Sequence, residues 1–320
     1  AAHAHSDGDH PGFAISGQAC LVGVVTELSF ACGDTAGLQM AMRLDARGRV
    51  RLGLNFGDYL TGGIAVDIGE QDENGNRTFD IDLTDAALQI AELGWSKRSG
   101  TPARASFLMR ERGDQMLVRN LSVRANGLSV SGSLDFTDGD LRTADLDRVA
   151  LDGVGTFSLA LTRNGSNTSA RLRGDRFVLT PDLLRGDPQA AGALSLDVQV
   201  GELITQTGGR LTDVRLTYAQ NSERITAFDA RARHVDGTDL AGTLATRGDR
   251  ESLVISSGTA GTILRFLGLY ERAQGGRATL VLEPQSVGGR VAGRLLLRDY
   301  AIVDEPAMER IFTNGRDQAQ

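Results

Sequence analysis

The chain has 320 residues, of which 41% are hydrophobic and 5% aromatic, and its formal net charge is −7. Lysine and arginine are scattered, which argues against a nucleic-acid partner because phosphate binding needs a concentrated basic face. No window approaches the roughly 20 apolar residues of a membrane-spanning helix, and the start resembles no signal peptide. We therefore expect a cytosolic protein, or a mature or excised segment.

Residues 1–12 are polar and are predicted to form a flexible tail. The tail holds three of the four histidines and two aspartates: His3, His5, Asp7, Asp9 and His10. Such a group can bind zinc or nickel, but a catalytic metal site normally gathers ligands from across a fold. The only other histidine is His234. We expect adventitious affinity for metals here, and predict no metal site and no cofactor.

Strand-like segments run from about Ala14 to Gly69 and include both cysteines, Cys20 and Cys32. In an oxidising compartment the two could pair across neighbouring strands, if their Cα atoms lay within about 7 Å. They could equally be two small buried apolar residues. The sequence does not decide between these readings.

A helix is predicted from Asp82 to about Leu93, capped by Asp82 or Thr84 and closed by Gly94. Its apolar residues recur at helical spacing: Leu83, Ala86, Ala87, Ile90 and Leu93. Trp95, the only tryptophan, follows directly and is predicted to anchor the core where sheet and helix meet.

Strands are predicted again from Pro102 to about Leu179 and from Gly192 to Ile255, separated by a helical or irregular link that begins at Pro181. Asn126-Gly127 and Asp138-Gly139 are strong hairpin signals. A second helix is predicted from about Thr259 to Arg272, ended by Gly275-Gly276. Two strands and a last helix from Pro306 follow. We expect two β units, residues 13–180 and 181–320, each with one helix.

Several of these strands alternate apolar and polar residues without a break, which gives one apolar and one polar face. Many such strands joined by short turns predict a mostly β fold built on one long antiparallel sheet. Residues 194–200 and 214–218 show the pattern most clearly. The predicted apolar surface comprises Leu194, Leu196, Val198, Val214, Leu216, Phe266, Leu267, Leu280, Leu282, Leu295 and Leu297.

Groups for catalysis are scarce. Asp229, Asp236 and Asp239 could suggest the paired carboxylates of a hydrolase, but in strands and turns they more often face solvent or accept hydrogen bonds from turn amides. No nucleophile elbow, phosphate loop or Cys–His pairing is present. We predict that the protein is not an enzyme.

Three segments, in this order, resemble the bacterial AsmA-like family, close to its YhdP branch. They are Leu93-Gly94-Trp95-Ser96-Lys97-Arg98-Ser99-Gly100-Thr101-Pro102-Ala103, then Thr262 to Gly276 (TILRFLGLYERAQGG), then Gly293 to Met308 (GRLLLRDYAIVDEPAM). The resemblance covers roughly residues 80 to 312. The chain departs from the family in lacking the membrane anchor and in being far shorter, so it looks like a segment of a longer protein.

The resemblance implies a long, bent β-sheet that forms an open, taco-like groove lined with apolar side chains and flanked or capped by helices. It also implies a periplasmic location, an inner-membrane anchor in the full-length protein, and a role in moving phospholipid toward the outer membrane. Membrane association through flanking regions and envelope protein partners would follow. The predicted apolar surface would then contact acyl chains.

A different reading stays open. The same apolar residues could pack against a second sheet or the helices and form an ordinary closed core. The protein would then be a structural or scaffold protein built of β repeats. The apolar face of the helix at 259–272 would be a partner or lipid surface in the first reading and would pack on the sheet in the second, and for this helix we favour packing on the sheet. A helix packed on the sheet could still form a wall of the groove.

Overall fold

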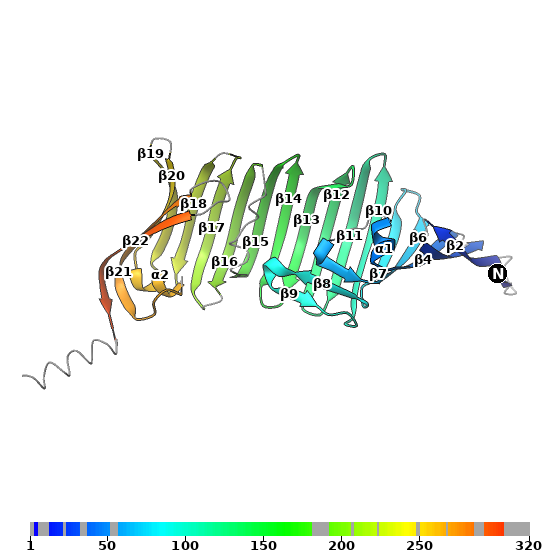
Figure 1. The fold of residues 1–320 in the computed structure, drawn as a ribbon, viewed down its shortest axis with the longest axis horizontal. Coiled ribbons are helices and arrows are strands. Elements are labelled where there is room, and N and C mark those ends of the chain that lie inside the picture. The colour runs from blue at the N-terminus through cyan, green and yellow to red at the C-terminus, as the bar shows by residue number, and fades with distance from the viewer. Residues whose placement is uncertain are drawn as a thin grey trace, which may run out of the picture. The chain divides into compact units, whose positions relative to one another are not determined.

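The chain folds into a mostly β structure, in which the helices of the described residues are short, shown as a computed structural model in Figure 1. The structure describes residues 3–5, 13–21, 24–32, 37–51, 57–180, 192–205, 208–222, 224–247, 250–266, 268–284 and 291–303. There are two compact units: Ala1–Asp152 with Ser158–Thr162, and Gly153–Phe157 with Arg163–Gln320. The predicted division into residues 13–180 and 181–320 stays a prediction.

The main sheet of the first unit is antiparallel throughout its described pairings. Its strands are β1 (His3–His5), β2 (Phe13–Leu21), β3 (Val24–Cys32), β4 (Gly37–Leu44), β6 (Ile64–Gln71), β7 (Arg77–Asp82), β10 (Ala103–Arg112), β11 (Gln115–Ala125), β12 (Leu128–Thr137) and β13 (Asp140–Leu151). The predicted turns at Asn126-Gly127 and Asp138-Gly139 are confirmed. Part of the predicted tail, β1, pairs with β2.

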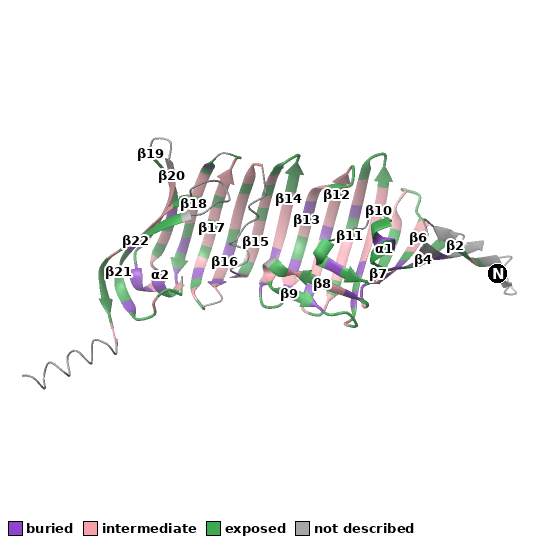
Figure 2. Ribbon diagram, viewed as in Figure 1, coloured by how far each residue is buried: buried purple, intermediate pink, exposed green. Residues whose placement is uncertain are grey.

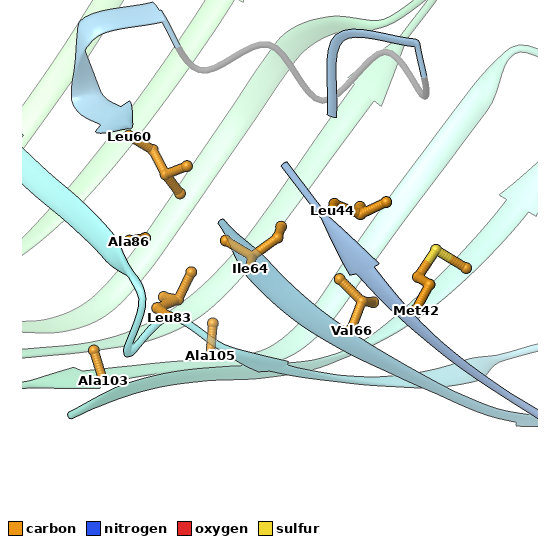
Figure 3. Close-up of a cluster of buried hydrophobic side chains, with 9 residues drawn as sticks. All are labelled: Met42, Leu44, Leu60, Ile64, Val66, Leu83, Ala86, Ala103 and Ala105. Atoms are coloured by element: carbon orange, nitrogen blue, oxygen red, sulfur yellow. The ribbon is translucent and has the colours of Figure 1, made fainter. Parts of the chain in front are cut away.

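Shorter elements complete the first unit beside the main sheet, and some of them contribute to its core. They are α1 (Ala46–Arg51), η1 (Gly57–Tyr59), β5 (Leu60–Gly62), β8 (Ala86–Ile90), η2 (Ala91–Leu93) and β9 (Trp95–Lys97). Strands β5, β8 and β9 form a small antiparallel sheet. Leu60, Leu83 and Ala86 pack with side chains of β4, β6 and β10 in one buried cluster, drawn in Figure 3. Trp95 is buried, as predicted.

The helix predicted over residues 82–93 is wrong. The local cap forms, since Asp82 Oδ1 accepts the Thr84 amide at 2.8 Å, but the chain then continues into β8 and a 3₁₀ turn. The reason lies in the backbone carbonyl groups of this segment. In a helix they would accept hydrogen bonds from the helix's own amides, whereas here they accept from a lysine side chain. The buried Lys97 ammonium donates to the carbonyls of Leu83 (2.8 Å), Thr84 (3.2 Å) and Ala86 (2.6 Å).

Helix α1 also differs from the sequence prediction, which placed only strands between Ala14 and Gly69. Its Arg49 is buried, and the guanidinium donates to the carbonyls of Leu60 and Gly62 at 3.2 Å each. Arg49 thus links α1 to β5, because buried backbone acceptors need a donor.

The second unit is a mixed sheet of long strands. It contains β15 (Asn167–Leu179), β16 (Leu194–Thr205), β17 (Arg210–Gln220), β18 (Ile225–His234), β19 (Asp239–Arg247), β20 (Arg250–Ser257), β21 (Ala273–Pro284) and β22 (Val291–Ile302). Strand β14 (Gly155–Asn164) contributes to both units. The strands after β16 pair antiparallel in chain order.

Strands β15 and β16 are parallel, which corrects the prediction of a purely antiparallel sheet. To form a parallel pair, the chain must return to the end of the sheet at which the first strand began. A hairpin turn cannot do this, so a longer crossover connection is needed. The link predicted from Pro181 occupies that place in the sequence and lies outside the described residues, as does the helix predicted from Pro306.

Helix α2 (Ala260–Phe266) confirms the second predicted helix in a shorter form. It ends in a left-handed glycine, Gly268, whose amide donates to Arg265 O (3.0 Å) while the Leu269 amide donates to Leu264 O (2.9 Å). This pair of bonds is the Schellman ending. The predicted stop at Gly275-Gly276 instead lies in β21.

The cysteines lie on neighbouring strands but at different positions along them. Cys20 pairs with Val25, whereas Cys32 pairs with Phe13, seven positions from Cys20 along β2. At about 3.3 Å per residue this separation exceeds 20 Å, well beyond the reach of a disulfide. The backbone register therefore argues against the pairing that the sequence left open.

Candidate functional site

One side of the second unit carries a surface of apolar side chains that crosses its strands in register. Val198 stands opposite Leu216, which stands opposite Ala230, and the row continues through Gly242 and Ile255 on β19 and β20. Leu280 and Leu295 complete it on β21 and β22, and Leu172 precedes it on β15. Register of this kind produces a continuous strip because neighbouring strands lie about 4.8 Å apart.

A second row runs beside the first. Leu196 is opposite Tyr218, and Tyr218 is opposite Phe228. On the following strands Leu244 is opposite Leu253, which is opposite Leu282. We call the two rows together the apolar face: Leu172, Leu196, Val198, Leu216, Tyr218, Phe228, Ala230, Leu244, Leu253, Ile255, Leu280, Leu282 and Leu295.

Every side chain of the apolar face is half-buried and none falls among the fully buried core residues, whereas Gly242, through which the first row passes, is buried. Figure 2 shows this as intermediate colouring along much of β15, β16 and β17. Residues in a closed core between two layers would lose nearly all their accessible surface. The face therefore keeps apolar area in contact with solvent.

The other side of β15–β18 is polar and ion-paired. Asp197 on β16 accepts hydrogen bonds from Arg173 on β15, with Nη2 at 2.8 Å from Oδ2, and Arg171 lies 3.8 Å away. Arg231 pairs with Asp229 along β18 at 3.3 Å. The arginine side chains hold the Asp197 pKa below its usual value, the hydrogen bond from Arg173 contributing most. The two sides of β15–β18 thus differ sharply in polarity, whereas on β20 and β21 the second side also carries the apolar pair Val254 and Val281.

Helix α2 covers one end of the apolar side. Its buried Ala260 and Ile263 pack with Ala278 of β21, and the half-buried side chains around this cluster are Leu240, Ile255, Leu295 and Leu297. The prediction that this helix packs on the sheet is confirmed. Two of the predicted surface residues, Leu295 and Leu297, therefore border the helix.

The other predicted surface residues also lie on this side or at the helix. Leu194, Leu196, Val198, Val214, Leu216, Leu280 and Leu282 are all half-buried strand residues. Phe266 is the last residue of α2, and its carbonyl accepts from the Thr205 hydroxyl at 3.3 Å. Leu267 lies outside the described residues. The structure thus gathers β16, β17, β21 and β22 onto one sheet, as their alternation indicated.

Sequence reasoning missed the contribution of β15 and β18–β20. Leu172, Phe228, Leu244, Leu253 and Ile255 belong to the apolar face, although none was singled out. In β20 the run Leu253-Val254-Ile255 hides the alternation, because apolar Val254 takes the polar side. Side chains alternate between the two faces of a strand, and the turn of a hairpin fixes which residues stand opposite each other. Counting outward from each turn in steps of two is the signal that could have identified these residues.

Known proteins give no guide to this surface. No protein-family model, curated protein or solved structure matches the chain. Within the described residues, no helix is both long and apolar enough to cross a membrane. Nor do three or more metal-ligating side chains gather anywhere in that part of the chain.

A serine and a histidine do meet beneath α2. His234 Nε2 lies 2.8 Å from Ser257 Oγ, which donates to Thr259 O and accepts from the Thr259 amide. Both side chains are buried, so no substrate reaches the hydroxyl. The pair acts in packing, linking the end of β18 to the start of α2. Burial lowers the pKa of His234, which keeps the ring neutral.

The three carboxylates considered for catalysis are exposed, and each already has an ion-pair or hydrogen-bond partner within the protein. Asp229 pairs with Arg231 and Asp239 with Arg233, at 3.3 and 3.4 Å. Asp236 accepts from the Thr238 amide at 3.0 Å and from the Thr262 hydroxyl at 3.0 Å. The expectation that these groups face solvent or bind turn amides is confirmed.

Proposed function

We propose that the apolar face of the second unit binds the acyl chains of phospholipid and conducts them along the sheet. The single observation that carries the proposal is the half-buried apolar surface, continuous in register from β15 to β22. Lipid is the partner that such a surface fits.

The energetics favour an acyl chain over a compact apolar ligand. Moving a chain out of water is worth about 0.8 kcal/mol per CH₂, so a carrier gains most from a long, unbroken apolar strip. The rows of the apolar face run across the strands, and each adds contact to the next. Tyr218 supplies a polar margin, since its hydroxyl donates to Gln220 Oε1 at 2.6 Å within the same strand.

The resemblance to the AsmA-like family supports the cellular part of the proposal. It would place the chain in the periplasm, as a segment of a protein anchored in the inner membrane. Phospholipid would then move between inner and outer membranes, with envelope proteins or flanking regions at the ends. The protein would act by binding and conducting, without catalysis.

Lipid extraction from the purified chain, followed by mass spectrometry, tests the proposal. We expect acyl-chain lipid to copurify with the wild-type protein. Leu216→Glu places a charge in the middle of the apolar face and should remove most of that lipid. Thr217→Glu is the matched control, because the next residue of the same strand points to the polar side.

Both variants should keep the far-UV circular dichroism of the wild type, so that a loss of lipid is not a loss of fold. If the wild type carries no acyl lipid, or both variants retain it equally, the proposal is wrong. That result would favour the second candidate function, a scaffold protein with a closed core. One observation already favours it: the buried cluster in the first unit is packed by the chain itself.

A further inference from the structure

The first unit carries a charged surface on the side of its main sheet opposite the buried cluster. Val66, Ile81 and Ala105 point into the cluster, so Asp67, Asp80, Asp82, Arg104 and Ser106 point to the other side. All three aspartates and Arg104 are exposed.

The charges on this surface are segregated by sign. Asp67 stands directly opposite Asp80 on neighbouring strands β6 and β7. Arg104 stands directly opposite Arg124 on β10 and β11. We call Asp67, Asp80 and Asp82 the aspartate patch, and Arg104, Ser106, Ser122, Arg124, Ser129, Ser131 and Arg148 the arginine–serine patch.

The arginine–serine patch contains no acid across four strands. Ser122 stands opposite Ser106 on one side and Ser131 on the other, while Arg124 faces Ser129 and Ser131 faces Arg148. Guanidinium and hydroxyl groups are among the side-chain donors that proteins use for phosphate oxygens. Clustered on one face, they present several donors to a single oxyanion.

Segregation of like charges costs stability, because like charges directly opposite on a sheet repel. The second unit avoids the cost: Arg215 and Arg231 also stand opposite each other, but Arg231 pairs with Asp229 at 3.3 Å. Among described residues, the side chains of Arg104, Arg124 and Arg148 make no ion pair within 4.0 Å and no hydrogen bond, although the charge of Arg104 helps to lower the pKa of Asp82.

The two patches meet. Asp82 stands opposite Arg104, and Asp80 opposite Ser106. The whole aspartate patch and the nearer part of the arginine–serine patch line an open groove of about 1610 Å³, to which the second patch contributes Arg104, Ser106, Ser122 and Arg124. The other charged residues of its lining are Arg43, Asp45, Arg47, Arg51 and Asp85. Arg43 lies on β4 beyond the aspartate patch, so the patch has cations on both sides.

We propose that this groove binds a phosphate that carries an amine, with the phosphate on the arginine–serine patch and the ammonium on the aspartate patch. Asp82 and Arg104 stand on neighbouring strands about 4.8 Å apart, which is close to the span of a two-carbon link between phosphate and amine. One ligand at this shared edge thereby brings a cation to the aspartate patch and an anion to the arginine–serine patch.

The phosphate could come from a lipid headgroup or from a free metabolite with the same chemistry. The inference stands on the charged groove alone, and rests on the proposed function only where the ligand is a lipid. A soluble headgroup without acyl chains therefore tests it independently of the apolar face.

Calorimetric titration with glycerophosphoethanolamine is the direct experiment. Glycerophosphoglycerol, the same phosphodiester without the amine, is the matched probe. We expect the amine-bearing diester to bind more tightly. In the double variant Arg104→Gln/Arg124→Gln, binding of both diesters should weaken at least about tenfold, as expected for the loss of charge-assisted hydrogen bonds.

A second pair of variants separates the two patches. Asp67→Asn/Asp80→Asn should abolish the preference for the amine while leaving the bare diester bound. Arg215→Gln/Arg231→Gln, the opposed arginines of the second unit, should change nothing. Exposed positions make all these substitutions compatible with folding.

Vesicles containing phosphatidylethanolamine identify the source. Tighter binding to vesicles than to the soluble diester, lost in Arg104→Gln/Arg124→Gln, indicates a lipid headgroup, whereas equal affinity indicates a free ligand. Absence of binding to either probe, no preference for the amine, or undiminished binding in the arginine variant would overturn the inference. Leu216→Glu should not affect the soluble diester, so failure of the lipid proposal remains distinguishable.

Discussion

A few buried polar side chains decide how the chain packs around its sheets. His234 has 1% of its surface exposed, and it joins the β18–β19 turn to Ser257 just before α2. Within the described part of the chain, its Nδ1 has no hydrogen-bond partner. A proton on Nδ1 would therefore be buried without an acceptor, which is costly.

This histidine makes stability depend on pH. Burial, the largest effect, lowers the pKa of His234 below 6.5, and Arg265 acts in the same direction while Asp236 opposes it. The unfolded chain therefore takes up a proton near pH 6.5 that the folded chain resists. The stability that neutral His234 contributes to the folded state is fully present above about pH 6.5. It is lost as the pH falls toward the pKa of His234 in the folded state.

When the pH is lowered from about 7 to about 5, the urea concentration at half-unfolding should decrease more for the wild type than for His234→Gln. The other histidines, His3, His5 and His10, are common to both proteins, so the difference in slope isolates His234. Parallel pH profiles in the two proteins would contradict this account.

A buried lysine explains why one predicted element does not exist. Lys97 binds the backbone carbonyls of Leu83, Thr84 and Ala86, whereas the buried Arg49 binds those of Leu60 and Gly62 on β5. The apolar spacing of residues 83–93 is helical, yet a lysine beyond that segment takes its carbonyls. Such a contact is set by the tertiary fold, so no local pattern could have predicted it.

At the scale of elements, α2 is seated by close backbone contact with β21. A Cβ atom at Gly261 would collide with the carbonyl group of Ala273. Ala273 itself is fully buried, and Arg265 Nη1 donates to its carbonyl at 3.1 Å. Glycine is required here by space, since helix and strand approach more closely than any side chain allows.

Gly261→Ala should therefore destabilise the second unit by about 1–3 kcal/mol, the usual cost of overpacking a core. Gly258→Ala is the control, because the nearest atom to its added Cβ is Thr238 Cβ at 3.7 Å. Thermal unfolding of the two variants measures the difference. Equal melting temperatures would show that α2 can shift away from β21 without loss.

The elements that sequence predicted best are the long strands with unbroken alternation. In β16 and β17, Leu196, Val198 and Leu216 fall on one face and Asp197 and Thr217 on the other, as their parity requires. A β-bulge breaks this parity between Thr212 and Arg215. In β18–β20 small residues, or apolar residues on both faces, obscure the alternation further. This is why the residues of the apolar face on those strands were not predicted.

At the scale of the whole molecule, charge pattern carried less information than hydrophobic pattern. The sequence shows scattered arginines and a net charge of −7. Only strand pairing brings Arg104 opposite Arg124 and Asp67 opposite Asp80. Their sequence separations follow no period, so the charged groove could not be found before the register was known.

The exposed area of the apolar face leads to a last prediction about the intact chain. Without lipid, this face contacts water, and a contiguous exposed apolar surface binds hydrophobic dyes and promotes association. Detergent-delipidated protein should therefore bind more anilinonaphthalene sulfonate and melt at a lower temperature than protein with its lipid. A ligand that binds only the folded state stabilises it by mass action, so adding a phospholipid back should reverse both changes. Leu216→Glu should show the lower melting temperature before delipidation and no recovery afterwards. A melting temperature indifferent to lipid in the wild type would mean that the strands shield their apolar residues from water by themselves.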